Sequence, residues 1–173
     1  GGGDDDIFNI DESQNGTLSG DDGDDDFIVA DAVVVTGTID GGAAATAAGD
    51  ELNLSGYTTT VATTLTAEGG TDGFDGSVTG VVTNFANINE VTAGSAADDS
   101  LTGADLTSTW TLDTAGAGSV ATAGASLAFS NTESVAGGSA VDTFNLTAAD
   151  WGDVAGGGDD DIFNIDESQN GTL

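Results

Sequence analysis

The stretch GGGDDDIFNIDESQNGTL at residues 1–18 recurs letter for letter at residues 156–173, which sets a period of 155 residues. Self-similarity at a fixed period is the signature of a repeat architecture, in which each unit is completed by its neighbour. We interpret residues 1–155 as one tandem repeat unit and residues 156–173 as the start of the next, identical unit of a longer array. This interpretation predicts self-association through tandem or head-to-tail repeats.

A shorter pattern, an aspartate two positions ahead of Phe or Leu, punctuates the unit at intervals of mostly 19 to 27 residues. Segments such as DIFNI and DTFNL alternate apolar and polar residues between Gly, Asp, Ser or Asn, which is typical of short β-strands. The pattern begins at Asp6, Asp25, Asp50, Asp72, Asp99, Asp142 and Asp161.

This periodicity predicts an all-β fold, namely a parallel β-helix-like β-solenoid with coils of about 22 residues and about seven coils per unit. The segment TWTLD at 109–113 supplies the strand of the one long interval. A second self-similarity relates residues 85–98 to residues 129–142. The alternative architecture is a string of tandem β-sandwich domains, which also have short strands at regular spacing.

The charge balance is extreme, since the 173 residues include 31 Asp and Glu but no Lys, Arg, His or Cys. No salt bridge can form between side chains, and a net charge of −31 destabilises a compact chain by self-repulsion. Ca²⁺ binds six to eight oxygen ligands, which carboxylates and backbone carbonyls supply. We therefore predict Ca²⁺ as a cofactor. A solvated acidic surface of the halophile type is the alternative.

Three segments resemble a known family. GGGDDDIFN at 1–9, GDDGDDDFI at 20–28 and GGSAVDTFN at 137–145 are similar to the Gly-Gly-x-Gly-x-Asp-x-apolar-x nonapeptide of RTX calcium-binding proteins, with Asp6, Asp25 and Asp142 at its aspartate. Longer segments look like the repeats of giant bacterial RTX-type adhesins and haemagglutinin-like β-solenoid proteins. The resemblance implies an extracellular, cell-surface repeat region that is stiffened by calcium.

An independent calcium pattern spans residues 11–22, where DESQNGTLSGDD places oxygen-bearing residues at EF-hand-like positions around the sharp turn of Gly16. The EF-hand resemblance covers the loop alone, because no helices flank it. An Asn-Gly hairpin turn is the competing interpretation. The predicted ligands of this loop are Asp11, Ser13, Asn15, Thr17 and Asp22.

Runs of aspartate provide the remaining candidate ligands. Strand alternation leaves some members of each run facing a neighbouring strand, where they cannot all stay charged without a cation. A solvated acidic edge that discourages lateral pairing is the alternative. These candidates are Asp4, Asp5, Asp6, Asp24, Asp25, Asp26, Asp98, Asp99, Asp142, Asp159, Asp160 and Asp161.

The composition also argues against several functions. Nucleophilic catalysis needs a base such as His or Lys, and both are missing, so we expect no enzyme activity. A chain without basic residues offers phosphates no counter-charge, so nucleic acid is excluded as a partner, and membrane insertion is not expected. We expect an extracellular structural repeat of a fibre, stalk, sheath or filament. The alternatives are an adhesive module that binds cell-surface polysaccharide or other cells, and an S-layer-like protein.

Overall fold

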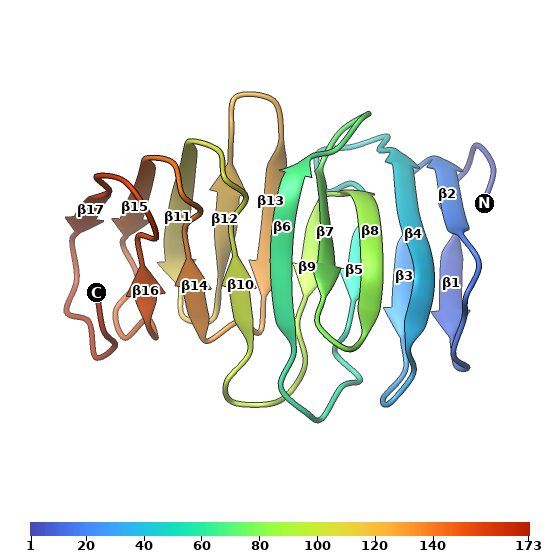
Figure 1. Cartoon of the computed structure of the whole chain (residues 1–173), viewed down its shortest axis with the longest axis horizontal. Coiled ribbons are helices and arrows are strands. Elements are labelled where there is room, and N and C mark those ends of the chain that lie inside the picture. Colours follow the sequence, from blue (N-terminus) through green and yellow to red (C-terminus); the bar gives the residue numbers. More distant parts are fainter.

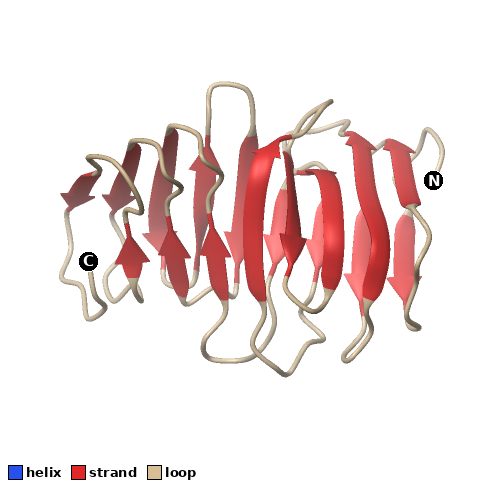
Figure 2. Cartoon of the chain, in the orientation of Figure 1, coloured by secondary structure: helices blue, strands red, loops and turns tan.

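The computed structural model describes all residues 1–173 as strands and loops (Figure 2). The strands form two sheets. The structure contains no helix that is long and apolar enough to cross a membrane. The nine-stranded sheet runs in the order β1 (Ile7–Ile10), β3 (Asp26–Val29), β5 (Glu51–Asn53), β9 (Glu90–Thr92), β13 (Ser126–Ser130), β12 (Ala117–Ala121), β11 (Ser108–Thr114), β15 (Asp142–Leu146) and β17 (Ile162–Ile165). The eight-stranded sheet runs in the order β16 (Val154–Ala155), β14 (Ser134–Ala136), β10 (Ser100–Thr102), β6 (Ala62–Glu68), β7 (Phe74–Val78), β8 (Val82–Ile88), β4 (Val35–Ala43) and β2 (Leu18–Asp22).

At both ends of the molecule the chain changes sheet after every strand, so that strands stack along the long axis (Figure 1). β1, β3 and β5 pair in parallel, with Phe8 opposite Phe27 and Phe27 opposite Leu52. β15 and β17 pair in the same way, with Phe144 opposite Phe163. The Asp-x-(Phe/Leu) pattern therefore predicts the register of the terminal strands.

In the middle of the molecule the chain stays in one sheet for three strands, and it does so twice. β6, β7 and β8 follow one another in the eight-stranded sheet, and β7 is antiparallel to both of its neighbours. β11, β12 and β13 repeat this arrangement in the nine-stranded sheet, with β12 antiparallel to both neighbours.

The predicted β-solenoid of about 22-residue coils is wrong, because the two sheets are mixed parallel and antiparallel and resemble a β-sandwich. The long interval between Asp99 and Asp142 contains the three-strand insertion β11, β12 and β13, in which β12 is antiparallel to both neighbours. A two-residue loop, Ala115-Gly116, joins β11 to β12, and Gly116 takes the positive φ of 74° that such a turn needs. TWTLD lies in β11, as expected for a strand.

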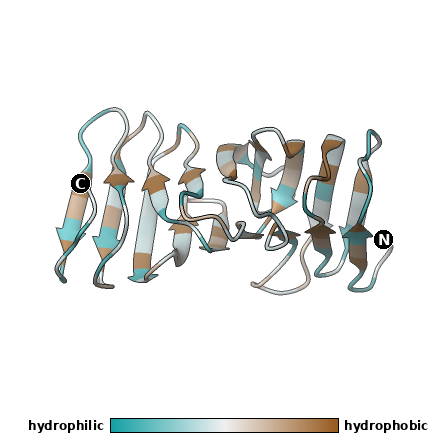
Figure 3. Cartoon of the chain, turned by 90° about the horizontal axis from the view of Figure 1, so that it is seen from below, coloured by the Kyte–Doolittle hydropathy of each residue, from teal (hydrophilic) through white to brown (hydrophobic).

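The core lies between the sheets and forms a single hydrophobic cluster. Apolar and polar residues alternate along the strands, so each sheet turns one face inward and one outward (Figure 3). In the nine-stranded sheet, Trp110 stacks on Phe144 with ring centroids 5.5 Å apart, and Phe144 stacks on Phe163 at 5.0 Å. At the other end Phe8 stacks on Phe27 at 4.7 Å.

The two similar segments, 85–98 and 129–142, occupy corresponding places in opposite sheets. Each begins in the last strand of a three-strand insertion, β8 or β13. Asn87 and Asn131 then adopt the left-handed conformation, with φ of 54° and 55°. The chain crosses to the other sheet after each of them, into β9 and β14 respectively. The sequence similarity thus reflects a shared way of leaving a hairpin.

Candidate cation-binding site

A row of buried aspartates follows the edge at which the chain enters the strands of the nine-stranded sheet. The amide of Asp6 donates to Oδ1 of Asp25 at 2.9 Å, and the amide of Asp25 donates to Oδ1 of Asp50 at 2.8 Å. Near the other end, the amide of Asp142 donates to Oδ1 of Asp161 at 3.0 Å. Asp25, Asp50 and Asp142 are fully buried. Each carboxylate therefore takes the place of a backbone acceptor just before the strand begins.

A glycine five residues earlier makes room for several of these carboxylates. A Cβ at Gly20 would collide with Oδ2 of Asp25 and with the carbonyl oxygen of Gly41. A Cβ at Gly137 would collide in the same way with Oδ2 of Asp142. This contact gives the first glycine of the nonapeptide-like segments a physical role.

Burial leaves two carboxylates of this row unsatisfied, together with Asp99, which precedes β10 of the eight-stranded sheet. Oδ2 of Asp25, Asp50 and Asp99 has no hydrogen-bond donor. Burial raises the pKa of all three carboxyl groups, and for Asp50, where the charges of Asp25 and Asp72 add to the effect, it raises the pKa to about 6. At the next strand of the sheet, β9, the corresponding acceptor is the uncharged side-chain amide of Asn89, whose Oδ1 accepts the Asp50 N–H at 3.2 Å.

The EF-hand-like loop does not gather its predicted ligands around one point. Asp11 and Asn15 are exposed, whereas Ser13 Oγ accepts the Val34 amide at 3.0 Å. Asp22 is the last residue of the five-residue strand β2, which runs away from the turn at about 3.3 Å per residue. Thr17 lies just before that strand. The distance along β2 therefore separates Asp22 from the other four residues.

The aspartates of the turns, which are exposed or half-buried, make backbone contacts between neighbouring turns. The amide of Asp24 donates to Oδ1 of Asp5 at 2.9 Å, and Asp24 Oδ1 accepts the amides of Ala45 and Thr46. Hydrogen bonds from Thr46 lower the pKa of Asp24. The remaining exposed candidates of these turns are Asp4, Asp159 and Asp160.

Asp98 lies with two acids that the sequence analysis missed. Asp98, Glu133 and Asp153 line a depression of about 260 Å³ that no apolar residue borders. Glu133 Oε2 accepts the Asp99 amide at 2.8 Å, and Asp153 Oδ1 accepts the Thr172 amide at 2.7 Å. The depression therefore collects carboxylates from three successive strand entries of the eight-stranded sheet.

A second set of acids lies on the outer face of the nine-stranded sheet and combines the predicted Asp26 with Glu51 and Glu90, which the sequence analysis missed. Asp26 pairs with Glu51, and Glu51 pairs with Glu90, on the adjacent parallel strands β3, β5 and β9. Like charges directly opposite each other are destabilising. Burial, followed by the charges of Glu51 and Asp26, raises the pKa of Glu90. The signal was present, because these acids occupy the variable position of the Asp-x-apolar pattern or its Asn-x-Val equivalent.

The donor set fits calcium chemically, since it consists of carboxylate, amide and carbonyl oxygens with no nitrogen or sulfur competitor. The orphaned Oδ2 atoms of Asp25, Asp50 and Asp99 are buried polar atoms that lack a positive partner. No three carboxylates converge closely enough to form a metal centre by themselves. The acids instead lie in rows, spaced by the strands.

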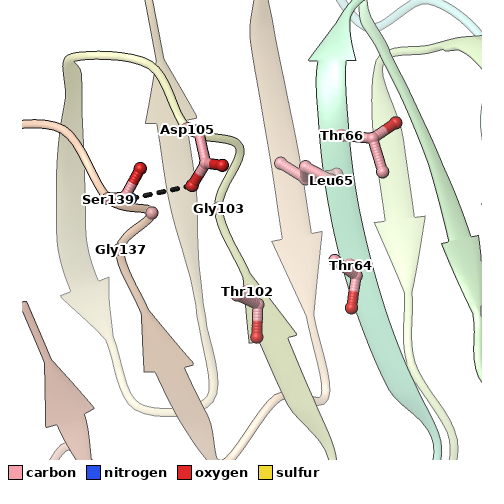
Figure 4. A pocket seen from close by; sticks show the side chains of 9 residues that line it. Thr64, Leu65, Thr66, Thr102, Gly103, Asp105, Gly137 and Ser139 are labelled. Atoms are coloured by element: carbon pink, nitrogen blue, oxygen red, sulfur yellow. Dashed lines mark hydrogen bonds between the residues drawn. The ribbon is translucent and has the colours of Figure 1, made fainter. Parts of the chain in front are cut away.

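A polar groove of about 560 Å³ opens on the eight-stranded sheet, and Figure 4 shows the side chains that line it. Leu65 is its one apolar residue, beside the hydroxyl groups of Thr64, Thr66 and Thr102. The Ser139 amide donates to Asp105 Oδ1 at 2.9 Å across one end of the groove.

No protein family, curated protein or solved structure matches this chain.

Proposed function

We propose that this chain is a calcium-stabilised structural repeat of a long extracellular fibre, stalk, sheath or filament at a cell surface. The observation that supports this proposal most concerns the two copies of the 18-residue motif, at residues 1–18 and 156–173. Their backbones form hydrogen bonds to neighbouring strands through opposite edges. One copy lies at each end of the nine-stranded sheet, as the edge strands β1 and β17.

In the first copy, the backbone groups of the even-numbered residues point toward the strands that follow it in the chain. The amides of Asp22, Asp26, Ala30 and Thr36 donate to carbonyl oxygens of this copy at 2.8 to 3.1 Å. The accepting residues are Gly2, Asp6, Ile10 and Gln14.

In the second copy, the backbone groups at the positions equivalent to odd-numbered residues of the first copy point toward the strands that precede it in the chain. The amide of Gly158 donates to Gly138, and the amide of Asp166 donates to Leu146. The carbonyls of Ser168 and Thr172 accept from Asp150 and Val154. These four residues correspond to Gly3, Asp11, Ser13 and Thr17 of the first copy.

A single copy of the motif could therefore pair with β15 on one side and with β3 on the other, using each backbone group once. In a tandem array the sheets and the aromatic stack of Phe144, Phe163 and the next Phe27 would continue without a linker between units. Such continuity suits a fibre that spans distance and bears load.

Calcium is the second part of the proposal, and the acid rows support it. Asp26, Glu51 and Glu90 lie side by side, and the chain has no Lys, Arg or His side chain to neutralise them. Divalent cations bound to these partly exposed acids would remove this repulsion. The resemblance to RTX repeats supports the same cofactor and the extracellular location.

The melting temperature tests the calcium proposal. Millimolar Ca²⁺ should raise it by many degrees relative to EGTA, and Mg²⁺ at the same ionic strength should raise it less, because Mg²⁺ gives up its water reluctantly. Identical melting curves in Ca²⁺ and EGTA would refute the calcium-dependent function.

The array is tested with a chain in which residues 1–155 precede the 173-residue chain. At the joint, the internal copy of the motif should exchange its amide hydrogens at least tenfold more slowly than the terminal copies, because both its sides are paired. Equal exchange in all three copies would mean that the units are independent beads.

An adhesive module is the second candidate function, and the groove on the eight-stranded sheet favours it. Its hydroxyl groups and the Asp105 carboxylate suit a polar ligand such as a cell-surface polysaccharide. Retention on a polysaccharide array that is lost in Thr102→Val, but kept in the distant surface variant Thr36→Val, would support this function. Absence of retention on any polysaccharide would count against it.

A further inference from the structure

We propose that separate copies of this chain associate end to end, the β17 edge of one copy pairing in parallel with the β1 edge of the next. The inference rests on the same complementary edges as the proposed function, but it concerns a non-covalent contact between chains. The occupant of each edge is a second copy of the same chain.

The two edges present complementary backbone groups. Successive peptide groups of a strand point to opposite sides within the sheet. Because Asp6 and Ile10 face β3, the peptide groups of Ile7 and Asn9 face the open side of β1. Because Asp166 faces β15, the peptide groups of Phe163 and Ile165 face the open side of β17.

The contact would repeat a pairing that the molecule already contains. The backbone groups of Asp6, Phe8 and Ile10 in β1 point toward β3. The backbone groups of the identical residues Asp161, Phe163 and Ile165 in β17 point toward the open side. With Phe163 opposite Phe8 of the second copy, the ring stack would continue as it does between Phe8 and Phe27.

The aspartate row would also continue through the contact. Asp142 donates its amide to Asp161, and Asp6 donates its amide to Asp25. In the in-register contact the amide of Asp161 would donate to the carboxylate of Asp6 in the second copy. The edges therefore match in backbone, in aromatic stacking and in side-chain capping.

Exposed apolar residues support the same surface. Six large hydrophobic residues are exposed in the whole chain, and four of them lie in the two copies of the motif. Ile7 is 64% exposed and Ile162 is 50% exposed. The in-register contact would place these two side chains opposite each other, on the outer face of the joined sheet.

The geometry is head to tail, so association does not close on itself and should give linear filaments. The acidic ends repel each other at low ionic strength. Association is therefore expected in Ca²⁺ or at about 1 M NaCl, where the screening length falls to about 3 Å.

The test uses two proline variants of the full chain at opposite edges. Asn9→Pro removes an N–H on the open side of β1, and Ile165→Pro removes one on the open side of β17. Both side chains are exposed, and proline is tolerated at an edge whose N–H faces solvent. Circular dichroism and melting should confirm that both variants are folded.

Sedimentation velocity in Ca²⁺ supplies the readout. The wild-type chain should show a weight-average mass that rises severalfold with concentration, whereas each variant alone should remain a monomer. An equimolar mixture of the two variants should give a species of twice the monomer mass and nothing larger, because each variant keeps one intact edge. A monomeric wild-type chain, a self-associating variant or a monomeric mixture would overturn the proposal.

The outcome is separable from that of the proposed function. If the wild-type chain stays monomeric while the internal motif of the two-unit chain is protected, the tandem array stands and only association between separate chains fails. If the internal motif is unprotected as well, both proposals fall together.

Discussion

The ends and the middle of this molecule build the same two sheets in different ways. At the ends, β1 to β5 and β14 to β17, the chain lays down one strand in each sheet in turn, and all pairing is parallel. In the middle, β7 and β12 run against their neighbours. Each insertion has three strands, so its outer strands still point the same way as the sheet around it. At the ends, a further parallel strand could be added to each sheet in the same way. In the middle, each insertion adds strands to one sheet and leaves the direction of the surrounding parallel strands unchanged.

The core composition follows the same division. In the middle, Phe129 packs edge-on against Trp110 of β11 and against Trp151 of the adjoining C-terminal end, with ring centroids about 6 Å apart in both pairs. The ends stack phenylalanine on phenylalanine in parallel. The terminal strands, which carry the two copies of the 18-residue motif, thus pack identical rings together, whereas Phe129 packs against rings of another kind.

The largest loss of stability is expected when the contact between the middle and the C-terminal end is removed. Trp110→Ala removes a fully buried side chain that stacks on Phe144, and it should lower the free energy of unfolding by about 3–5 kcal/mol in a urea titration. Phe8→Ala, at a partly exposed edge, is the control and should cost clearly less. Equal losses would mean that the middle is no more tightly packed than the ends.

The second effect concerns the boundary at which the aspartate row of the N-terminal end meets the amide of Asn89. The folded pKa of Asp50, about 6, exceeds its ordinary value of 3.8. Its stabilising contribution is therefore complete below about pH 3.8 and is lost as the pH rises through about 6. Asp50→Asn stays neutral, so it should gain roughly 2–3 kcal/mol over the wild-type chain between pH 4 and pH 7.5.

This gain is measured as the difference in unfolding free energy between the two proteins at each pH. Asp113→Asn, at an exposed position in β11, removes the same charge and serves as the control. A gain no larger than that of the control would show that Asp50 titrates like a surface carboxylate.

The third effect tests the packing of the antiparallel strand β7. A Cβ at Gly76 would collide with the Phe85 ring and with the Thr64 carbonyl oxygen. Gly76→Ala should therefore cost about 1–3 kcal/mol. Gly70→Ala, where nothing lies within 4 Å, should be nearly neutral in the same urea titration. A neutral Gly76→Ala would contradict close packing in the insertion.

The smallest effect tests the turn that the two similar segments share. Asn131 holds a φ of 55°, and Ala in that conformation should cost about 1 kcal/mol, while Gly should cost nearly nothing. Asn87 should rank the substitutions in the same order, with a larger loss because its side chain also donates to Asp40 at 2.8 Å. Thermal melts of the four variants give this ranking, and an Ala variant as stable as the Gly variant at either position would contradict it.

Much of the terminal architecture could be predicted from sequence because it depends on local spacing. Phe8, Phe27 and Leu52 follow an aspartate by two residues, and the structure places them opposite one another. The hairpins were missed although Gly80 and Gly116 mark their turns, since a chain with 28 glycines offers many such signals. Which glycine turns the chain back within a sheet depends on the strands already present beside it.

The candidate ligands divide in the same way. Aspartates at strand entries were identified from the repeat, but Glu51 and Glu90 were not, because their proximity arises only from the pairing of β5 with β9, which are 39 residues apart in register. Conversely, Asp22 has the sequence spacing of a calcium loop, and the extended strand β2 carries it away from Asp11.

By itself the sequence determined that this protein is all-β, that residues 1–18 recur at residues 156–173, and that its acids precede apolar strand residues, since these properties follow from composition and short-range patterns. Only the tertiary structure decided which strands reverse, which acids become neighbours, and that the two copies of one motif expose opposite backbone sides. The physical reason is that a strand has two pairing edges and two faces. Its own residues set the faces, whereas the neighbours it meets in three dimensions decide which edge is used.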